Sequence, residues 1–525
     1  MRIGFCSLYS WRPHVEHLHF LANLARRAGH EAHFLSCDGD LPVCYTRAMR
    51  DRPAWRECLE CRAGGIRSYE KRNVSSLGRH LRAGAVHQSE ARREWAHSSA
   101  STLGRFESDE DYGSQGFTAL VDQLEPVVRM SYAAARDWIE SRRLDAVCVF
   151  NGRMDATRSI LEAARSLNVR LLSVERTWLG DGLHLLPDEN CLGLQAINRL
   201  VGHWKDIPLT ESQARRAATF VARRFLGTNV REWRAYNTGA HAVSWPVADA
   251  ARRILLIPSS RNEVWGHPDW QPHWTDATAG YDAIIERLNL RGQDMVLRCH
   301  PNWGEKIGSR DGSASEHHYT DWARKRGVHC IGSTDRASTM SLLAECDAVV
   351  LANGSAAMEA GFLGKQVISI APSIYQAAGI RTEALTPEDL ASLHLWSDLP
   401  ESERAQKALQ IARQTLRFLF TMIYRVPQYT REVRADSTTR FRYSPDADPT
   451  RFVELLRTGE LRADDESRAA DSEGESIVLQ MIRSLNWQNL ARAQEIAPSD
   501  WKPLRRRLSR RPVDWLGRRK PVGDR

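Results

Sequence analysis

The sequence has no run of about eighteen apolar residues, so it predicts no membrane-spanning helix in its 525 residues. Its start, MRIGFCSLYSW, does not have the pattern of a signal peptide, because polar residues interrupt it at once and favour a first β-strand. Ten cysteines are scattered over the chain without an export signal, which is typical of a reducing compartment. We therefore expect a cytoplasmic protein.

Two nucleotide-binding signatures are also missing. No stretch of the sequence matches the P-loop or the GxGxxG fingerprint of dinucleotide-binding proteins. Their absence argues against ATP hydrolysis by a P-loop enzyme and against redox chemistry with NAD.

Excess positive charge is confined to the C-terminal end. The formal charge is +8, and residues 501–525 hold ten Lys or Arg and two Asp, so the rest of the chain is nearly neutral. A neutral body is not typical of nucleic-acid-binding proteins, and no nucleic acid is expected as a partner. The tail could bind an anionic membrane surface, because apolar side chains interrupt its basic residues; an arm that is disordered or contacts nucleic acid is the alternative. These apolar residues are Trp501, Leu504, Leu508, Trp515 and Leu516.

Short apolar segments alternate with amphipathic helical segments, as in parallel sheets built from βα units. The fold class is therefore α/β, with two Rossmann-like domains that face a cleft. We assign residues 1–240 to the first domain and 250–430 to the second, and we expect an extension at 431–525. Within the extension, residues 461–476 are acidic and predict a flexible linker. Strands are expected at Arg2–Leu8, Glu31–Ser36, Leu144–Phe150, Val169–Val174, Ile254–Ile257, Met295–Cys299 and Cys346–Ala352.

The second half contains the stronger candidate site. One predicted strand ends at His300-Pro301-Asn302 and another ends at Asn353-Gly354-Ser355. Ligands of parallel sheets bind outside the carboxyl ends of the strands, where helix N-termini offer N–H groups to anions. His300 could neutralise or protonate a phosphate leaving group there, and its neighbours could bind phosphate, ribose or base. The candidate substrate-binding residues are Ser259, Ser260, Glu263, Arg298, Pro301, Asn302, Asn353, Gly354, Ser355 and Glu359; each could instead be an ordinary cap or turn residue.

The first half would then bind the acceptor. Asn151 and Arg153 follow a predicted strand, as does His14, which could contact the acceptor or a phosphate or simply begin a helix. Glu175 and Asp181 lie in a glycine-containing turn, where either carboxylate could take a proton from an acceptor hydroxyl. The alternative is that these carboxylates cap a helix or pair with nearby arginines.

Four cysteines, Cys37, Cys44, Cys58 and Cys61, have the spacing C-x6-C-x13-C-x2-C. In a cytosolic chain this cluster predicts a zinc ion held by four thiolates. Such a site would be structural, since four protein ligands leave no open position for catalysis. Four unlinked thiols are the alternative.

An aromatic loop follows the strand Ile254–Ile257 and contains Trp265, His267, Trp270, His273 and Trp274. Rings of this kind could stack on a sugar or a base, although they also fill crevices in proteins.

Motifs of the second half resemble those of the capsule polysaccharide biosynthesis glycosyltransferases. The motifs are Ser259-Ser260-x-x-Glu263, Arg298-x-His300-Pro301-Asn302, the stretch 332–348, and Asn353-Gly354-Ser355 through Glu359-Ala360 to Gly364-Lys365. The His-Pro pair and the later serine are also similar to CMP-binding motifs of bacterial sialyltransferases. In the first half, Phe150-Asn151-Gly152-Arg153 and the stretch Glu175–Asn190 look like that family's strand-end loops. The resemblance covers about residues 1–425.

The resemblance implies the two-domain GT-B fold and, as in some members, transfer of Kdo from CMP-Kdo. His300 and Ser355 would bind the nucleotide phosphate, and an acidic residue between Glu175 and Asp181 would be the base. Family members often have Glu-Asp-Gly or Glu-Glu-Gly at this turn, which this chain lacks. The flanking glycines favour Asp181 as the base, with Glu175 second.

The leading hypothesis is an inverting, metal-independent glycosyltransferase that requires no cofactor. It would move a sugar from a nucleotide-sugar donor, CMP-linked and Kdo-like, to a cell-surface polysaccharide or glycolipid such as capsule or lipopolysaccharide. One alternative is a polyol-phosphate transferase or a nucleotide-sugar epimerase on the same fold. Another is a non-catalytic scaffold in polysaccharide assembly.

Overall fold

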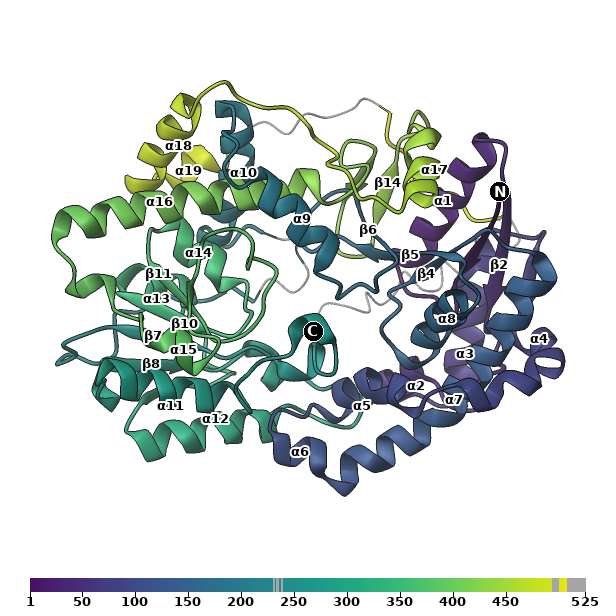
Figure 1. Ribbon diagram of the computed structural model, residues 1–525, viewed down its shortest axis with the longest axis horizontal. Coiled ribbons are helices and arrows are strands. Elements are labelled where there is room, and N and C mark those ends of the chain that lie inside the picture. Colours follow the sequence, from purple (N-terminus) through teal and green to yellow (C-terminus); the bar gives the residue numbers. More distant parts are fainter. Residues whose placement is uncertain (230–231, 233–235, 238, 493–499, 508–525) are drawn as a thin grey trace.

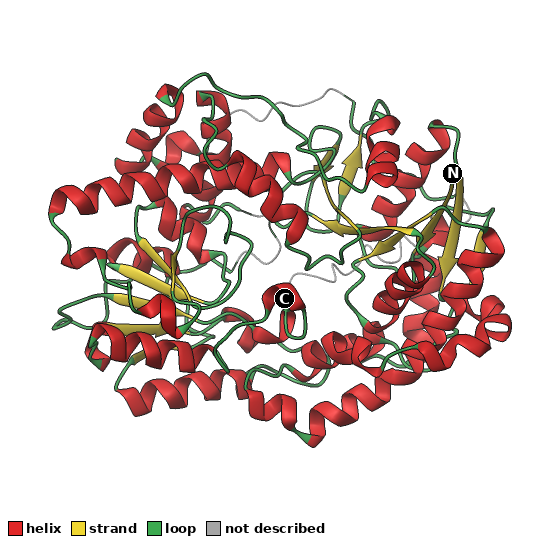
Figure 2. Ribbon diagram, in the orientation of Figure 1, coloured by secondary structure: helices red, strands yellow, loops and turns green. Residues whose placement is uncertain are grey.

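The computed structural model describes residues 1–229, 232, 236–237, 239–492 and 500–507 (Figure 1). It contains two six-stranded sheets on opposite sides of the molecule, each surrounded by helices (Figure 2). The first sheet consists, in spatial order, of β3 (Val74–Ser76), β2 (Glu31–Ser36), β1 (Arg2–Cys6), β4 (Ala146–Phe150), β5 (Arg170–Arg176) and β6 (Leu183–Pro187). The second consists of β12 (Thr382–Glu383), β11 (Gln366–Ser369), β10 (Ala348–Leu351), β7 (Ile254–Ile257), β8 (Met295–Arg298) and β9 (His329–Ile331).

Both sheets have the strand order of a Rossmann fold. All neighbouring strands run parallel except β6, which is antiparallel to β5. The order reverses between β1 and β4 in the first sheet and between β7 and β10 in the second. At such a switch point the loops on either side diverge and leave room for a ligand. The predicted α/β fold class with two Rossmann-like domains is confirmed.

Burial explains why these segments form strands. Every residue of β4, β7, β8 and β10 is buried, so their apolar runs are covered on both faces by helices.

The first unit contains α1 (His14–Arg27), α4 (Leu77–Gly84), α5 (His97–Gly104), α6 (Asp109–Gly113), α7 (Gln115–Arg142), α8 (Asp155–Ser166) and α9 (Gln195–Trp204). The second contains α11 (Ala277–Leu288), α12 (Ser313–Arg326), α13 (Thr339–Glu345), α14 (Ala356–Phe362) and α15 (Pro387–Leu390).

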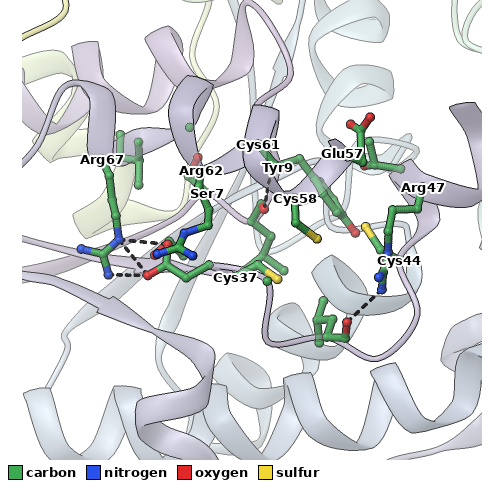
Figure 3. Close-up of a pocket in the computed structure, with 18 residues that line it drawn as sticks. Ser7, Tyr9, Cys37, Cys44, Arg47, Glu57, Cys58, Cys61, Arg62 and Arg67 are labelled. Atoms are coloured by element: carbon green, nitrogen blue, oxygen red, sulfur yellow. Dashed lines mark hydrogen bonds and ion pairs between the residues drawn. The ribbon is translucent and has the colours of Figure 1, made fainter. Parts of the chain in front are cut away.

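The cysteine-rich insertion lies between β2 and β3 and contains α2 (Tyr45–Arg50) and α3 (Ala54–Gly64). The side chains of Cys37, Cys44, Cys58 and Cys61 line one small cavity of about 40 Å³ (Figure 3). Burial raises the pKa of the Cys37 thiol, that of the Cys44 thiol to about 11 and that of the Cys61 thiol to about 12. These shifts favour the neutral thiol over the thiolate. Within the described residues, no three His, Cys, Asp or Glu side chains are arranged to hold a metal ion. The observed thiol arrangement does not itself fit a metal site, and zinc stays a prediction.

The chain crosses between the two units more than once. The helix α10 (Glu211–Phe225) packs on α14 and on α16 (Glu401–Phe420), and Thr210 and Gln213 form a capping box at its start. After α16, the short strands β13 (Val433–Ala435) and β14 (Phe441–Tyr443) lead to α17 (Pro449–Thr458), which packs on α1 and β5. The chain then returns to α18 (Glu473–Arg483) and α19 (Trp487–Leu490) beside α10. The extension therefore connects the two units.

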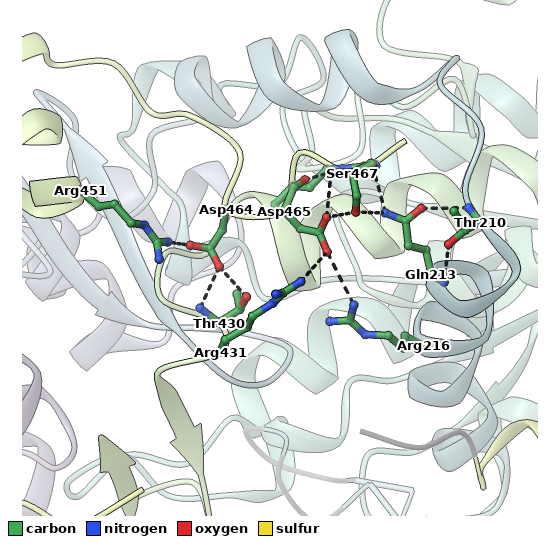
Figure 4. A network of polar contacts seen from close by, with 10 residues as sticks. Thr210, Gln213, Arg216, Thr430, Arg431, Arg451, Asp464, Asp465 and Ser467 are labelled. Atoms are coloured by element: carbon green, nitrogen blue, oxygen red, sulfur yellow. Dashed lines mark hydrogen bonds and ion pairs between the residues drawn. The ribbon is translucent and has the colours of Figure 1, made fainter. Parts of the chain in front are cut away.

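The acidic segment 461–476 is held in place, contrary to the prediction of a flexible linker (Figure 4). The carboxylate of Asp464 accepts the N–H groups of Tyr429 and Thr430 at 2.9 and 3.0 Å and pairs with Arg451. The next carboxylate, Asp465, lies 3.6 Å from the guanidinium of Arg216 on α10. The composition was misleading because these acidic side chains meet arginines from distant parts of the chain.

The basic tail is described only as far as Arg507, and Leu508, Trp515 and Leu516 lie outside the described residues. The described start lies against the part of the extension that holds β13 and β14: the indole N–H of Trp501 donates to the carbonyl of Arg431, and Lys502 pairs with Tyr443 through the main chain. Among the described helices, none is both long enough and apolar enough to cross a membrane.

Candidate active site

A pocket of about 450 Å³ lies at the carboxyl edge of the second sheet, around the switch point between β7 and β10. It gathers seven of the predicted residues: Ser259, Arg298, His300, Pro301, Gly354, Ser355 and Glu359. They come from the last residue of β8, from the loops after β7, β8 and β10, and from α14. The loop 333–337 after β9, which belongs to the motif 332–348, and residues near the end of α10 complete the lining. No pattern in the sequence indicates that the α10 residues belong to the site. We call this the strand-end pocket.

His300 is held by the turn that it begins. Its Nδ1 accepts the N–H of Asn302 at 3.2 Å, and the ring lies edge-on to Tyr236 with 5.9 Å between centroids. Because Nδ1 is an acceptor, a neutral His300 carries its proton on Nε2. The imidazole can therefore act as a hydrogen-bond donor toward an anion.

Ser260 and Asn302 support the site rather than line it. Both are buried, and the Ser260 hydroxyl donates to Oδ1 of Asn302 at 3.1 Å, which joins the turns after β7 and β8. The Ser259 hydroxyl accepts the N–H of Asn353 at 3.4 Å and so joins the turn after β7 to the one after β10. A Cβ atom at Gly354 would lie 3.3 Å from that hydroxyl, so this close approach favours glycine. Three strand-end turns are thus locked to one another.

Arg298 also has a supporting role. It is buried, and its guanidinium donates to the carbonyl of Gly332 and, at 2.9 Å, to that of Asp335. Burial lowers the pKa of this arginine. Arg298 thereby holds the loop after β9 against the pocket.

Glu359 has one paired oxygen and one without a partner among the described residues. Its Oε1 pairs with Arg224, which also pairs with Glu232 at 2.7 Å. The other oxygen, Oε2, is buried and has no hydrogen-bond partner within the described residues. Since Glu359 lines the strand-end pocket, this acceptor could receive a hydroxyl of a bound ribose.

In the first unit, the predicted residues His14, Asn151 and Glu175 meet at the switch point of the first sheet. Nδ1 of His14 lies 3.2 Å from Oε1 of Glu175, in a contact that is not aligned as a hydrogen bond. Asn151 donates its Nδ2 to Oε2 of Glu175 at 2.9 Å, and the N–H of Arg176 donates to Oε1 at 2.9 Å. Burial raises the pKa of Glu175 and lowers that of His14 well below its usual range. A neutral imidazole can accept a proton, and because its pKa is lowered, His14 would need the negative charge of Glu175 beside it to do so near neutral pH.

Arg153 and Glu263 connect the two units. The guanidinium of Arg153, two residues beyond Asn151, donates to the main-chain carbonyl of Glu263 at 2.8 Å, while the Glu263 side chain is exposed. Beside this contact, the carboxylate of Glu107 accepts the N–H of Arg261 and Nδ2 of Asn262, each at 2.9 Å. Burial raises the pKa of Glu107 to about 8. The loops after β4 and β7 therefore face each other across the boundary between the units.

Asp181 lies elsewhere, against the C-terminal extension. Its Oδ1 accepts the N–H of Ala435 in β13 at 2.8 Å, and the adjacent Gly182 donates its N–H to Val433 at 2.8 Å. The structure thus uses this carboxylate to hold β13. Its partner is 254 residues away in the sequence, so local spacing gave no sign of the contact.

The aromatic loop and Asn353 line a second pocket, of about 400 Å³, which also includes Ser259. We call this the aromatic pocket. The two pockets are therefore neighbours at the edge of the same sheet.

No protein-family model matches the chain. No curated protein matches it either. Solved structures that resemble it include the KpsC β-Kdo 2,4-transferase of Thermosulfurimonas dismutans, with 16% identity, a TM-score of 0.34, and coverage of 60% of this chain and 87% of that one. The UDP-GlcNAc 2-epimerase of Methanocaldococcus jannaschii has 11% identity, a TM-score of 0.27, and coverage of 74% and 91%. The glycosyltransferase SsfS6 of Streptomyces sp. SF2575 has 13% identity, a TM-score of 0.22, and coverage of 79% and 95%. At these values the likeness concerns the fold, and it assigns neither substrates nor residue roles to this chain.

Proposed function

We propose that the protein is a GT-B glycosyltransferase that transfers a sugar from a nucleotide-sugar donor to an acceptor hydroxyl. The strand-end pocket carries the proposal, because it combines His300, the Gly354-Ser355 turn and a buried, unpartnered oxygen of Glu359 at a switch point. Phosphate and ribose need these three kinds of group. The contact between Arg153 and Glu263 brings the loop beside His14 and Glu175 toward this pocket.

In the proposed reaction the donor phosphate lies between His300 and the Gly354-Ser355 turn, and a ribose hydroxyl donates to Glu359. The acceptor oxygen attacks the anomeric carbon, and the bond from that carbon to the phosphate oxygen breaks. Nε2–H of His300 then stabilises the charge that develops on the leaving phosphate. The acceptor proton passes to His14, whose positive charge is stabilised by Glu175. A single displacement of this kind inverts the anomeric configuration and needs no metal ion.

The donor and the acceptor follow from the sequence resemblance. The His-Pro pair and Ser355 support a CMP-linked donor of the Kdo type, and the acceptor would be a cell-surface polysaccharide or glycolipid. A peripheral position at the inner face of the membrane would place the enzyme beside such acceptors. NMR of the product tests the stereochemistry, since retained configuration would require a covalent intermediate instead of a single displacement.

Nucleotide binding is the first test. We expect CMP, but not CDP, UDP or GDP, to raise the melting temperature of the purified protein. At about a hundred times the dissociation constant, binding should add about 2.7 kcal/mol to the free energy of unfolding. A shift with UDP or GDP instead would keep a glycosyltransferase but remove the CMP-linked donor. No shift with any nucleotide would contradict the proposed function.

Substitution of His300 by alanine should lower kcat about a hundredfold, because one donor to the leaving phosphate is lost. The same change removes the acceptor for the Asn302 N–H and should lower the melting temperature slightly. His300→Asn is the matched control: asparagine can cap the turn but lacks the imidazole. We expect it to restore the melting temperature without restoring kcat. Wild-type turnover in both variants would exclude His300 from the reaction.

A further inference from the structure

The aromatic pocket beside the strand-end pocket is not used by the reaction described above. We propose that it binds the transferred sugar ring of the donor. This inference rests on the proposed function, since it extends the same donor from its phosphate to its sugar.

The position of the pocket is the first argument. Ser259 lines both pockets, and the aromatic pocket includes Asn353 where the strand-end pocket includes Gly354. The boundary between the pockets is therefore the pair of turns that the Ser259–Asn353 hydrogen bond joins. A phosphate at the Gly354-Ser355 turn would have its substituent next to this boundary. The volume, about 400 Å³, is within the range of about 300–1,000 Å³ that is typical of small-molecule sites.

The indole rings offer apolar faces, because their polar edges are already used. Nε1–H of Trp270 donates to the carbonyl of Leu192 at 2.6 Å, and that of Trp274 donates to the carbonyl of Ala384 at 2.9 Å. Trp265 is fixed by a stack on Tyr112 of the first unit, with 3.9 Å between centroids. A pyranose has an apolar face of C–H groups and a rim of hydroxyls, and rigid indole faces are suited to the former.

Several charged side chains of the pocket already have partners. Arg261 pairs with Asp109 at 2.7 Å, and Asp276 lies 3.2 Å from His318 and accepts the N–H of Ala279. Burial lowers the pKa of His267 to about 4, so it is neutral near pH 7. Because these charges already have partners, the pocket is a poor site for a diphosphate and a better site for a sugar ring, whose surface consists mainly of C–H groups and hydroxyls.

Hydroxyl partners are present around the rings. Gln271, His273, Thr275 and Asn353 line the pocket, and all four are at least partly exposed. The His273 ring lies perpendicular to Trp274 with 5.5 Å between centroids and can pair with a carboxylate where the sugar has one. Polar groups around an apolar face are the combination by which proteins bind sugars and fix their orientation.

The test compares CMP with CMP-Kdo by isothermal titration calorimetry. In Trp274→Ala the affinity for CMP-Kdo should fall about tenfold, while the affinity for CMP should stay close to wild type. Trp274→Phe keeps a ring and should retain most of the CMP-Kdo affinity, and it remains informative where the alanine variant folds poorly. Trp55→Ala is the matched control, because Trp55 is 72% exposed on α3 and lines neither pocket.

Three results would overturn the inference, and they separate it from the proposed function. Equal losses of affinity for CMP and CMP-Kdo in Trp274→Ala would mean that the indoles bind the nucleobase and not the sugar. Unchanged CMP-Kdo affinity in that variant, with normal CMP binding, would show that the pocket contacts neither part. Failure of the wild-type protein to bind any nucleotide would remove the proposed function and this inference together.

Discussion

Glu175→Gln is expected to lower kcat by roughly 10²- to 10⁴-fold, the usual range for loss of general-base catalysis, because the proposed base His14 loses the carboxylate beside it; the melting temperature should fall only modestly. Glutamine keeps the size of the side chain and one acceptor oxygen, which can replace the acceptor of either Asn151 or the Arg176 N–H, since these two groups donate to different oxygens of Glu175. It removes the negative charge 3.2 Å from His14, and with it the group that stabilises a protonated imidazole. Steady-state kinetics and thermal melts of the same preparations measure both effects.

The combination with His14→Ala shows whether the two side chains act together. If Glu175 works through His14, the double variant should be about as slow as the slower single variant. Substitutions within one catalytic unit do not have additive effects on the activation free energy. Independent roles would instead multiply the two losses. Multiplied losses, or near wild-type kcat in Glu175→Gln, would contradict the assignment of the base.

The pH profile gives a separate readout of the same prediction. Burial raises the pKa of Glu175 above its ordinary value, so the carboxyl is protonated and inactive at low pH and becomes charged as the pH rises. The rate of the wild-type enzyme should therefore rise with pH as Glu175 loses its proton. This acidic limb of the pH–rate profile should be absent in Glu175→Gln. Asp181→Asn serves as the control. It keeps an oxygen for the Ala435 N–H, and a loss as large as that of Glu175→Gln would restore Asp181 as the base.

The sequence was most informative where strands are buried on both faces. The bounds observed for β2 and β7 are those predicted, since an apolar run ending in a polar turn is a clear pattern. The edge strands β9 and β12 were missed. They have three and two residues, which is too short for any periodicity to be read. Pairing with a neighbouring strand defines them, and pairing cannot be read from so short a segment.

Much of the candidate site could also be predicted, because the rule that ligands bind at strand ends needs only strand positions. That rule brought His300, Ser355 and Glu359 to one pocket. It could not separate ligand contacts from supports: Ser260 and Asn302 bind each other, and this depends on how two turns meet. Nor could it find Arg224, which reaches Glu359 from a helix 135 residues earlier in the chain.

The C-terminal extension gives the largest expected effect on stability. Glu475, on α18, is fully buried and accepts from Nε and Nη2 of Arg417, both at 2.8 Å, and from the N–H of Leu209 at 2.8 Å. Glu475→Ala would leave the buried guanidinium of Arg417 without its counter-charge, and loss of one partner of a buried pair costs about 3–5 kcal/mol. Urea unfolding measures this difference.

Glu466→Ala is the matched control, because Glu466 belongs to the same acidic segment but is exposed. We expect its free energy of unfolding to stay within about 0.5 kcal/mol of wild type. A flexible linker would make the two substitutions equally harmless, so equal stabilities would contradict the ordered segment. A large loss in Glu475→Ala alone would show that the return of the chain to α10 and α16 is part of the fold. Because α10 also supplies Arg224 to the strand-end pocket, the same variant should weaken CMP binding under conditions where it is still folded.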